Sequence, residues 1–171
     1  MKEEHLPLVL SWRTSEEINN VMLSDVENDI EQQRHWFARI KCDERSRYWI
    51  IEHNDKPIGV LNQSEIDLTN KRCIWGFYIG DEESKPLGGL IPPYFYNHVF
   101  SHTTLIKITA EVLSNNKKVM KLHRLHGYRD VGVYLSHICK KSEWLDLHLF
   151  ELHKDDWKKK KRFTSFFAHF A

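Results

Sequence analysis

Apolar positions recur along the chain with two different periods, and the change of period predicts the order of helices and strands. Near the start and again between residues 26 and 40, apolar residues recur every three to four positions, which is typical of helices that bury one face. From residue 48 onward, short apolar runs alternate with turn residues, which is typical of strands. The predicted helices are 3–12, 16–23, 29–40, 90–102 and 116–126, and the predicted strands are 48–52, 58–67, 73–80, 105–113, 131–138 and 144–152.

This order favours an α/β protein of the α+β type, with one mixed sheet covered by helices. Antiparallel strands come first, and a strand–loop–helix–strand–helix unit follows. The chain has 171 residues, which suits a single domain with a sizeable core. We assign that domain to residues 1–157, and residues 158–171 form a basic and aromatic tail. Thr14 and Glu17 have the spacing of a capping box and predict where the second helix begins.

Composition and charge exclude several classes of function. Apolar residues make up 41% of the chain and charged residues 29%, and the net charge is +1, so we expect a globular protein without nucleic acid as a partner. No apolar run is long enough to cross a bilayer, so we expect no stable membrane insertion. Three scattered cysteines without a CxxC spacing predict reduced thiols in a cytoplasmic protein. His98 and His102 have the spacing of metal ligands, but no third ligand is evident and we predict no metal site.

Two stretches carry candidate chemistry. In 110–128, AEVLSNNKKVMKLHRLHGY, a carboxylate (Glu111) ends an apolar strand, an asparagine pair follows, and a basic helix carries His123. Upstream, Gly88 and Gly89 lie between a strand and a helix. A glycine turn that opens a helix presents backbone N–H groups and the positive end of the helix dipole, which can hold a pyrophosphate.

Taken in order, five segments carry a resemblance to a known family. They are WRTSEEINNVM, KPIGVLNQSEID, WGFYIG, the 110–128 stretch and WLDLHLFELHKDDW. Together they resemble the Gcn5-related N-acetyltransferase (GNAT) superfamily, and within it the PseH-type enzymes. Those enzymes acetylate the 4-amine of a UDP-linked dideoxy amino sugar in pseudaminic acid synthesis, which serves flagellin glycosylation. The resemblance implies a central, mostly antiparallel sheet of six to seven strands, with a V-shaped splay between two parallel strands.

The resemblance also implies a cofactor, an acceptor and roles for particular residues. Acetyl-CoA is the implied cofactor, a nucleotide-linked amino sugar is the implied acceptor, and a homodimer is a possible assembly. Glu111 takes the position of the base that deprotonates the amine, and His123 takes the position of the tyrosine that protonates the departing thiolate. The residues implied to hold acetyl-CoA are Phe77, Tyr78, Ile79, Lys85, Leu87, Gly88, Gly89, Asn115, Asn116 and Lys117. The residues implied to hold the acceptor are Arg13, Met22, Trp36, Ser64 and Tyr78, with Arg13 as the partner of a phosphate.

The chain departs from the family pattern in two further places. Pro86 stands where the cofactor loop should have its first glycine, and Pro92 and Pro93 remove N–H groups from the first turn of the following helix. Relatives also open with a strand before the first helix. Met1 lies almost on that helix, so either the true start lies upstream or the sheet lacks its first edge strand.

Other interpretations remain open for the same residues. Glu111 could be a solvent-facing strand residue, the asparagine pair could be only a helix cap, and His126 is expected to be an exposed helix residue. The whole chain could instead be a protein or ribosomal N-terminal acetyltransferase of the RimJ/RimL type, or a non-catalytic module with the same fold. Phenylalanines in the tail recur at near-helical spacing and predict a terminal helix that docks on the domain or on a second subunit, with a membrane surface as the alternative. These phenylalanines are Phe163, Phe166, Phe167 and Phe170.

Overall fold

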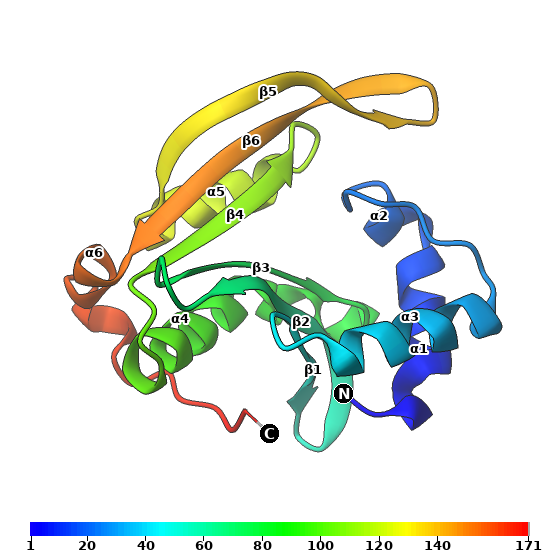
Figure 1. The fold of residues 1–171 in the computed structure, drawn as a ribbon, viewed down its shortest axis with the longest axis horizontal. Coiled ribbons are helices and arrows are strands. Elements are labelled where there is room, and N and C mark those ends of the chain that lie inside the picture. Colours follow the sequence, from blue (N-terminus) through cyan, green and yellow to red (C-terminus); the bar gives the residue numbers. More distant parts are fainter. Residues whose placement is uncertain (171) are drawn as a thin grey trace.

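A six-stranded sheet with the strand order β1-β2-β3-β4-β6-β5 forms the centre of the computed structural model, which describes residues 1–170 (Figure 1). The strands are β1 (Arg47–His53), β2 (Lys56–Asp67), β3 (Arg72–Ile79), β4 (Lys107–Leu113), β5 (Arg129–Lys140) and β6 (Glu143–His153). The α-helices are α1 (Leu6–Thr14), α2 (Glu16–Asn19), α3 (Ile30–Cys42), α4 (Ile91–His102), α5 (Lys117–His126) and α6 (Lys154–Lys158). Short 3-10 helices are η1 (Glu3–His5), η2 (Glu82–Leu90) and η3 (Lys161–Phe163).

The sheet splits between its two parallel strands. All neighbouring strands are antiparallel except β3 and β4, and these two pair only where Arg72–Ile74 lies opposite Lys107–Thr109. Beyond Ile74 and Thr109 the strands diverge, and the sheet opens into a V (Figure 1). The mixed sheet and the predicted splay are therefore confirmed.

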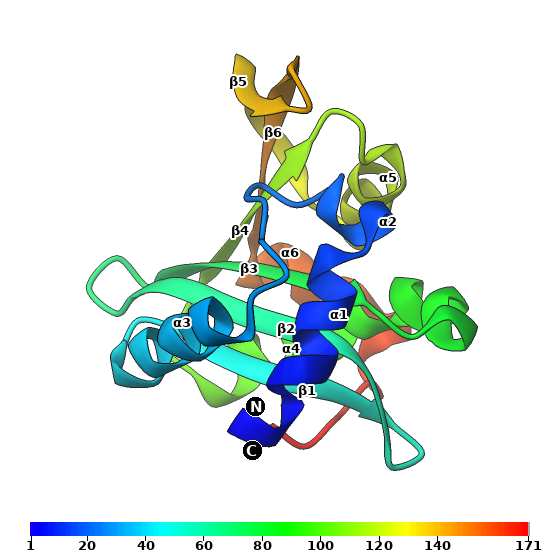
Figure 2. The ribbon, with the colours of Figure 1, turned by 90° about the vertical axis from the view of Figure 1, so that its right-hand side faces the viewer.

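Helices cover the part of the sheet formed by β1 to β3 on both faces (Figure 2). α4 packs on one face through Phe95, Tyr96 and Val99, none of which is exposed to solvent. α1 packs on the other face, where Trp12 lies so close to the end of β3 that a Cβ added to Gly80 would be 2.1 Å from its ring. Only glycine fits there, so Gly80 fixes the approach of α1 to the sheet.

Several local predictions at the N-terminal end need correction. The Thr14 capping box is wrong, because Thr14 is the last residue of α1 and its hydroxyl donates to the Leu10 carbonyl at 2.9 Å. Ser15 is the N-cap of α2 instead, and α2 ends at Asn19, four residues before the predicted end. The 81–89 loop is also more regular than expected, since most of it forms η2. Among residues 1–170 no strand precedes β1, which forms one edge of the sheet.

The tail docks on the domain as predicted, but the predicted terminal helix is wrong. Phe163 is buried, and the segment after η3 is irregular as far as residue 170. The Asn97 amide donates to the carbonyls of Phe163 and Phe166, at 2.8 and 2.9 Å. These hydrogen bonds fix the irregular tail to α4, and the Phe163 carbonyl also accepts from the Phe166 amide at 3.2 Å.

His126 is the clearest error about burial. It was expected to be exposed, yet only 1% of its surface is accessible, because the tail covers α5. Its ring lies 5.2 Å from that of Phe163 and 5.7 Å from that of Tyr96. None of the described helices is long and apolar enough to cross a membrane.

Candidate active site

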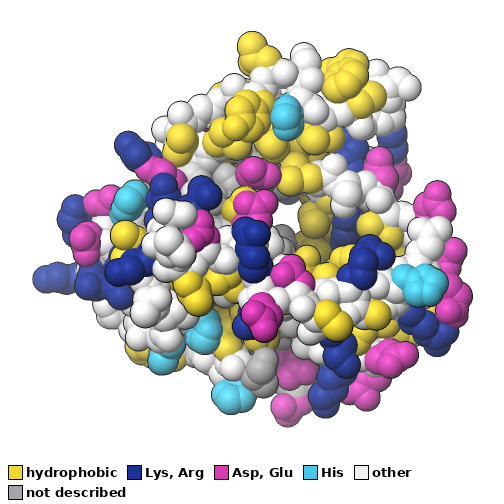
Figure 3. Space-filling view, viewed as in Figure 1, with side chains coloured by type: hydrophobic (Ala, Val, Ile, Leu, Met, Phe, Trp, Pro, Cys, Tyr) yellow, Lys and Arg dark blue, Asp and Glu magenta, His cyan; other side chains and the backbone are white. Residues whose placement is uncertain are grey.

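A cavity of about 790 Å³ lies where the sheet splits. Its walls come from α1, α3 and the segment between them, from β1 to β3, and from β4 and α5. Figure 3 shows the molecule hollowed at its centre, between the part built on β1 to β3 and the part built on β4 to β6. The predicted site residues that line the cavity are Arg13, Met22, Trp36, Ser64, Phe77, Tyr78, Glu111, Asn116 and His123.

The other predicted cofactor residues lie outside this cavity, mostly near the far end of β3. A Cβ on Gly88 would be 3.6 Å from the Ile79 side chain, and one on Gly89 would be 4.0 Å from Leu122 of α5. Both glycines therefore lie between the end of β3 and α5, directly before α4. The remaining positions, which also do not line the cavity, are Ile79, Lys85, Leu87, Asn115 and Lys117.

Lys85, which was predicted to bind acetyl-CoA, already forms ion pairs within the protein. Its ammonium pairs with the carboxylates of Glu17 and Glu82. Asn115 is also engaged, because its side-chain amide donates to the Asn20 carbonyl at 2.9 Å. Asn116, by contrast, caps α5 by accepting from the Val119 amide, and it lines the cavity as well.

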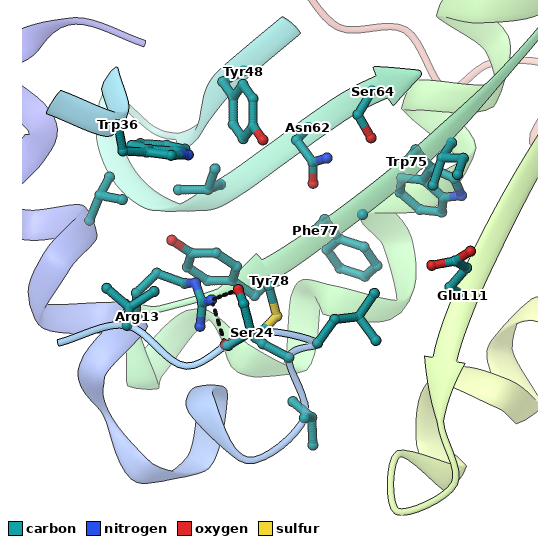
Figure 4. Close-up of a pocket in the computed structure, with 18 of the residues that line it drawn as sticks. Arg13, Ser24, Trp36, Tyr48, Asn62, Ser64, Trp75, Phe77, Tyr78 and Glu111 are labelled. Carbon is teal, nitrogen blue, oxygen red and sulfur yellow. Dashed lines mark hydrogen bonds between the residues drawn. The ribbon is translucent and has the colours of Figure 1, made fainter. Parts of the chain in front are cut away.

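Glu111 marks the acidic end of the cavity. It points from β4 across the gap toward β3 (Figure 4). The Glu111 side chain is exposed and faces the cavity. Desolvation by the atoms around it, and then the nearby charge of Glu65, raise the pKa of the Glu111 carboxyl. A carboxylate with a raised pKa holds a proton more readily, so Glu111 is a better base than an ordinary glutamate.

Glu65 is a lining residue that the sequence reading missed. It lies where the pairing of β2 with β3 shifts between Ser64 and Asp67, and its φ of 48° is in the left-handed region. Such a backbone angle is uncommon for residues other than glycine and recurs at bulges beside active sites. The sequence around it, NQSEID, has no glycine or proline that could have signalled the bulge.

His123 forms part of the cavity wall, and it is a neutral residue. Only 3% of its surface is exposed, and its ring lies 4.6 Å from Tyr128 and 6.0 Å from Trp75. Burial, together with nearby His126, lowers the pKa of His123 to about 3. In residues 1–170 its Nδ1 finds no hydrogen-bond partner. His123 therefore carries a neutral ring with a single N–H, and an imidazolium is disfavoured at neutral pH.

Arg13 marks the opposite, basic end. Its Nη2 donates to the Ser24 carbonyl at 3.1 Å and to the Ser24 hydroxyl at 3.3 Å (Figure 4). Its Nη1 is buried and has no partner within the described part of the chain. The Tyr78 hydroxyl, on the same cavity wall, is buried and likewise finds no partner among residues 1–170. Two polar groups at one end of the cavity thus lack the hydrogen bonds that buried groups normally make.

Aromatic rings line the cavity between the Arg13 end and the Glu111 end. Trp36 and Tyr48 pack edge to face with their ring centres 5.2 Å apart, and Figure 4 places both near the Arg13 end. Trp75 and Phe77 stack at 5.4 Å nearer Glu111. The Trp75 ring is oriented by its indole N–H, which donates to the Tyr128 hydroxyl at 2.8 Å. The cavity therefore offers flat apolar surface flanked by a cation and a carboxylate.

The features of the split sheet fit acetyl-CoA. Beyond Ile74, the β3 edge that faces the gap no longer pairs with β4, so its backbone can bond an extended chain as a strand would. The glycine pair and the start of α4 lie at the end of that edge, where backbone N–H groups and the helix dipole favour a pyrophosphate. Pro92 and Pro93 reduce the number of N–H groups there, whereas Gly88 and Gly89, in the last turn of the 3-10 helix η2, allow close approach to the backbone because they have no side chain.

Comparisons with known proteins agree with this geometry. Residues 2–149 match the model of the acetyltransferase (GNAT) domain. The structure is similar to that of spermidine N-acetyltransferase from Vibrio cholerae in complex with CoA and spermine, with a TM-score of 0.85 and 14% identity over 92% of this chain and 95% of that one. It is also similar to the dodecameric structure of the same enzyme in an intermediate state, with a TM-score of 0.78 and 15% identity over 94% of each chain. No curated protein sequence matches the chain.

Proposed function

Because the chain belongs to the acetyltransferase (GNAT) domain family, it is an acetyl-CoA-dependent N-acetyltransferase, and we propose that its acceptor is the amine of a nucleotide-linked amino sugar. The observation that carries the acceptor assignment is the unpartnered Nη1 of Arg13 in the cavity wall. A buried donor without a partner is costly, and more so when it carries charge. An acceptor that brings an anionic oxygen to this end of the cavity removes that cost.

The Arg13 end suits a phosphate in particular. A guanidinium pairs with phosphate oxygens through two parallel N–H groups, and Nη2 is already oriented by Ser24. The unpartnered Tyr78 hydroxyl can donate to the same anion. Trp36 supplies a flat face nearby that is suited to a nucleobase. Phosphate and base together describe a nucleotide.

Glu111 supports the chemistry at the other end. An acceptor amine is largely protonated at neutral pH and has to lose a proton before it attacks the thioester. Glu111 can take that proton, directly or through a water, and its raised pKa suits this role. Acetyl-CoA supplies the acetyl group as a thioester. Ser64 and Met22 complete the acceptor wall in this proposal.

His123 assists the leaving group in a limited way. A thiol has a pKa near 8.5, so the thiolate needs little help to depart. The neutral His123 ring can donate an N–H to the sulfur, and the proton that finally reaches sulfur can come from water. In this proposal the role of His123 changes from the expected proton donor to a hydrogen-bond donor.

The residues that would hold acetyl-CoA lie along the V. Phe77, Tyr78 and Ile79 provide the free β3 edge, and Gly88 and Gly89 provide N–H groups at the pyrophosphate end. Asn116 lines the gap from the start of α5, and Lys117 follows it in the chain. Leu87 belongs to the same turn as the glycines. Lys85 is expected to contribute little, because two glutamates already hold it.

A polyamine is the second candidate acceptor. The similar Vibrio cholerae enzyme is named as a spermidine N-acetyltransferase. Four carboxylates also line the cavity, and they would attract a polycation: Asp25, Glu27, Glu65 and Glu111. Arg13 separates the two candidates, because a polyamine has no oxygen to offer it and is repelled by its charge.

Steady-state kinetics of Arg13 variants test the proposal. With a UDP-linked 4-amino-4,6-dideoxy sugar as acceptor, Arg13→Met should raise the acceptor KM by roughly 10- to 100-fold, and Arg13→Lys by less, because lysine keeps the charge but loses the planar fork. The KM for acetyl-CoA should not change. Arg34→Met, which removes an exposed arginine from α3, is the matched control.

The outcomes exclude one candidate or the other. If the parent protein acetylates spermidine and leaves the UDP-linked sugar untouched, or if Arg13→Met lowers the KM for spermidine and leaves the KM for the sugar unchanged, the nucleotide-sugar assignment is wrong. Thermal unfolding of each variant identifies any loss of the fold.

A further inference from the structure

The β5–β6 hairpin reaches beyond the rest of the sheet. β5 and β6 pair along most of their length, whereas β4 pairs with β6 only as far as Leu113 opposite Leu147. Residues 136–146 therefore extend past the end of β4, toward α2 (Figure 1). Leu113, Leu145 and Leu147 form a small buried cluster against which Ile138 packs. This cluster supports the hairpin where it leaves the end of β4, and we call the projecting residues 136–146 the arm.

The arm ends in a buried lysine that contacts the opposite half of the molecule. The Lys140 ammonium lies 2.6 Å from Asp25 Oδ1 and 3.1 Å from the Asn19 carbonyl. Only 7% of Lys140 is exposed. A buried ammonium needs such partners, and each charged hydrogen bond that it makes is stronger than a neutral one. The next residue, Lys141, is exposed and pairs with Glu16 at 2.6 Å.

A second hydrogen bond holds the C-terminal end of α2. The Asn115 amide, in the turn between β4 and α5, donates to the Asn20 carbonyl at 2.9 Å. Asn19 and Asn20 are the last residue and the C-cap of α2, where a helix leaves carbonyls without internal partners. Both donors come from the far side of the V, so the end of α2 is tied across the gap.

The segment tied in this way forms one side of the cavity. Residues 21–27 all line it, and we call residues 20–28 the acceptor segment. Within it, Asp25 is held by Lys140, and the neighbouring Ser24 accepts two hydrogen bonds from Arg13. A continuous series of contacts therefore links the hairpin tip to the guanidinium at the basic end of the cavity.

We propose that Lys140 is a positioning residue, which fixes the acceptor segment and, through Asp25 and Ser24, the orientation of Arg13 toward the acceptor. The part that concerns the acceptor rests on the proposed function. The part that concerns the segment itself rests only on the contacts above. Lys140 lies in β5, far along the chain from the acceptor segment, and takes no part in the chemical step.

Hydrogen–deuterium exchange without any ligand tests the positioning directly. The Val21 and Met22 amides donate to the Ile18 and Asn19 carbonyls, so they report on the order of the segment. In Lys140→Met their exchange should be faster by on the order of tenfold, since the charged hydrogen bonds that hold the segment are lost. Lys140→Arg should restore most of the protection. Lys141→Met, which removes the exposed pair, should match the parent protein, and equal exchange in Lys140→Met and Lys141→Met would overturn the proposal.

Kinetics with the UDP-linked 4-amino-4,6-dideoxy sugar test the consequence for the acceptor. Lys140→Met should raise the acceptor KM about tenfold and leave the KM for acetyl-CoA unchanged, and Lys140→Arg should recover much of the difference. An acceptor KM in Lys140→Met equal to that in Lys141→Met would refute the link to Arg13. If the parent protein fails to acetylate this sugar, the proposed function is wrong, and the exchange measurement still decides whether Lys140 positions the segment.

Discussion

Acid sensitivity is the property for which the structure gives the most definite magnitude, because two histidines are buried. Burial lowers the pKa of His123 to about 3 and that of His126 to about 4. A histidine whose pKa is depressed in the folded state stabilises the fold above its ordinary pKa of about 6.5, and this contribution is lost as the pH falls below that value. From pH 7 to pH 5, each histidine should lower the free energy of unfolding by about 2 kcal/mol. Together they account for about 4 kcal/mol, a large part of the typical stability of a domain.

Urea unfolding followed by tryptophan fluorescence at pH 7 and pH 5 measures this loss. His123→Phe and His126→Phe should each reduce the difference between the two pH values by about 2 kcal/mol, and the double variant should remove most of it. His53→Gln, at an exposed position at the end of β1, is the control and should behave like the parent protein. If both buried variants lose as much stability between pH 7 and pH 5 as the parent does, the histidines are not buried in the neutral form and the account of His123 is wrong.

Three further predictions concern catalysis and the tail. Glu111→Gln should lower turnover by roughly 10²-fold or more and leave the affinity for acetyl-CoA intact. Part of the rate should return at high pH, because more of the amine is neutral there. Full activity of this variant at neutral pH would exclude Glu111 as the base. His123→Phe should lower turnover by less than about 10²-fold, and His123→Tyr should keep much of the rate. If His123→Phe is as fast as the parent protein, the histidine has only a structural role. Phe163→Ala should cost about 3–5 kcal/mol of stability in urea unfolding, whereas Phe167→Ala, at a position that is 66% exposed, should be nearly neutral. Loss of liposome binding with unchanged stability in a protein shortened after Trp157 would instead favour a membrane role for the tail.

The fold could be predicted from the sequence wherever side-chain period and turn residues agree. The period-two runs placed all six strands, and the resemblance placed the splay between β3 and β4, which the pairing confirms. The ends of α1 and α2 could not be predicted, because Thr14 and Ser15 are both residue types that suit an N-cap. In the structure Ser15 is the N-cap, although its hydroxyl donates to the Trp12 carbonyl and makes no capping bond. The course of the tail could not be predicted either, since Asn97, whose side chain bonds to it, is more than 60 residues away in the chain.

The residues of the candidate site also divide into those that the sequence predicted and those that it did not. The sequence identified residues from both sides of the cavity, including Arg13, Glu111 and His123, because each lies in a recognisable segment. It missed Glu65, whose position depends on a left-handed backbone angle that no sequence pattern indicated. It also missed the tie between Lys140 and Asp25, because an ion pair 115 residues apart in the chain leaves no local signal.

We propose that this acetyltransferase binds an acceptor that carries both an amine and a phosphate. The most direct test is a competition assay with acetyl-CoA in which the UDP-linked 4-amino-4,6-dideoxy sugar, spermidine and an N-terminal peptide are present at equal concentrations, with products identified by mass spectrometry. Acetylation of the UDP-linked sugar should dominate, and Arg13→Met should abolish that preference. Dominant acetylation of spermidine or of the peptide by the parent protein would contradict the account.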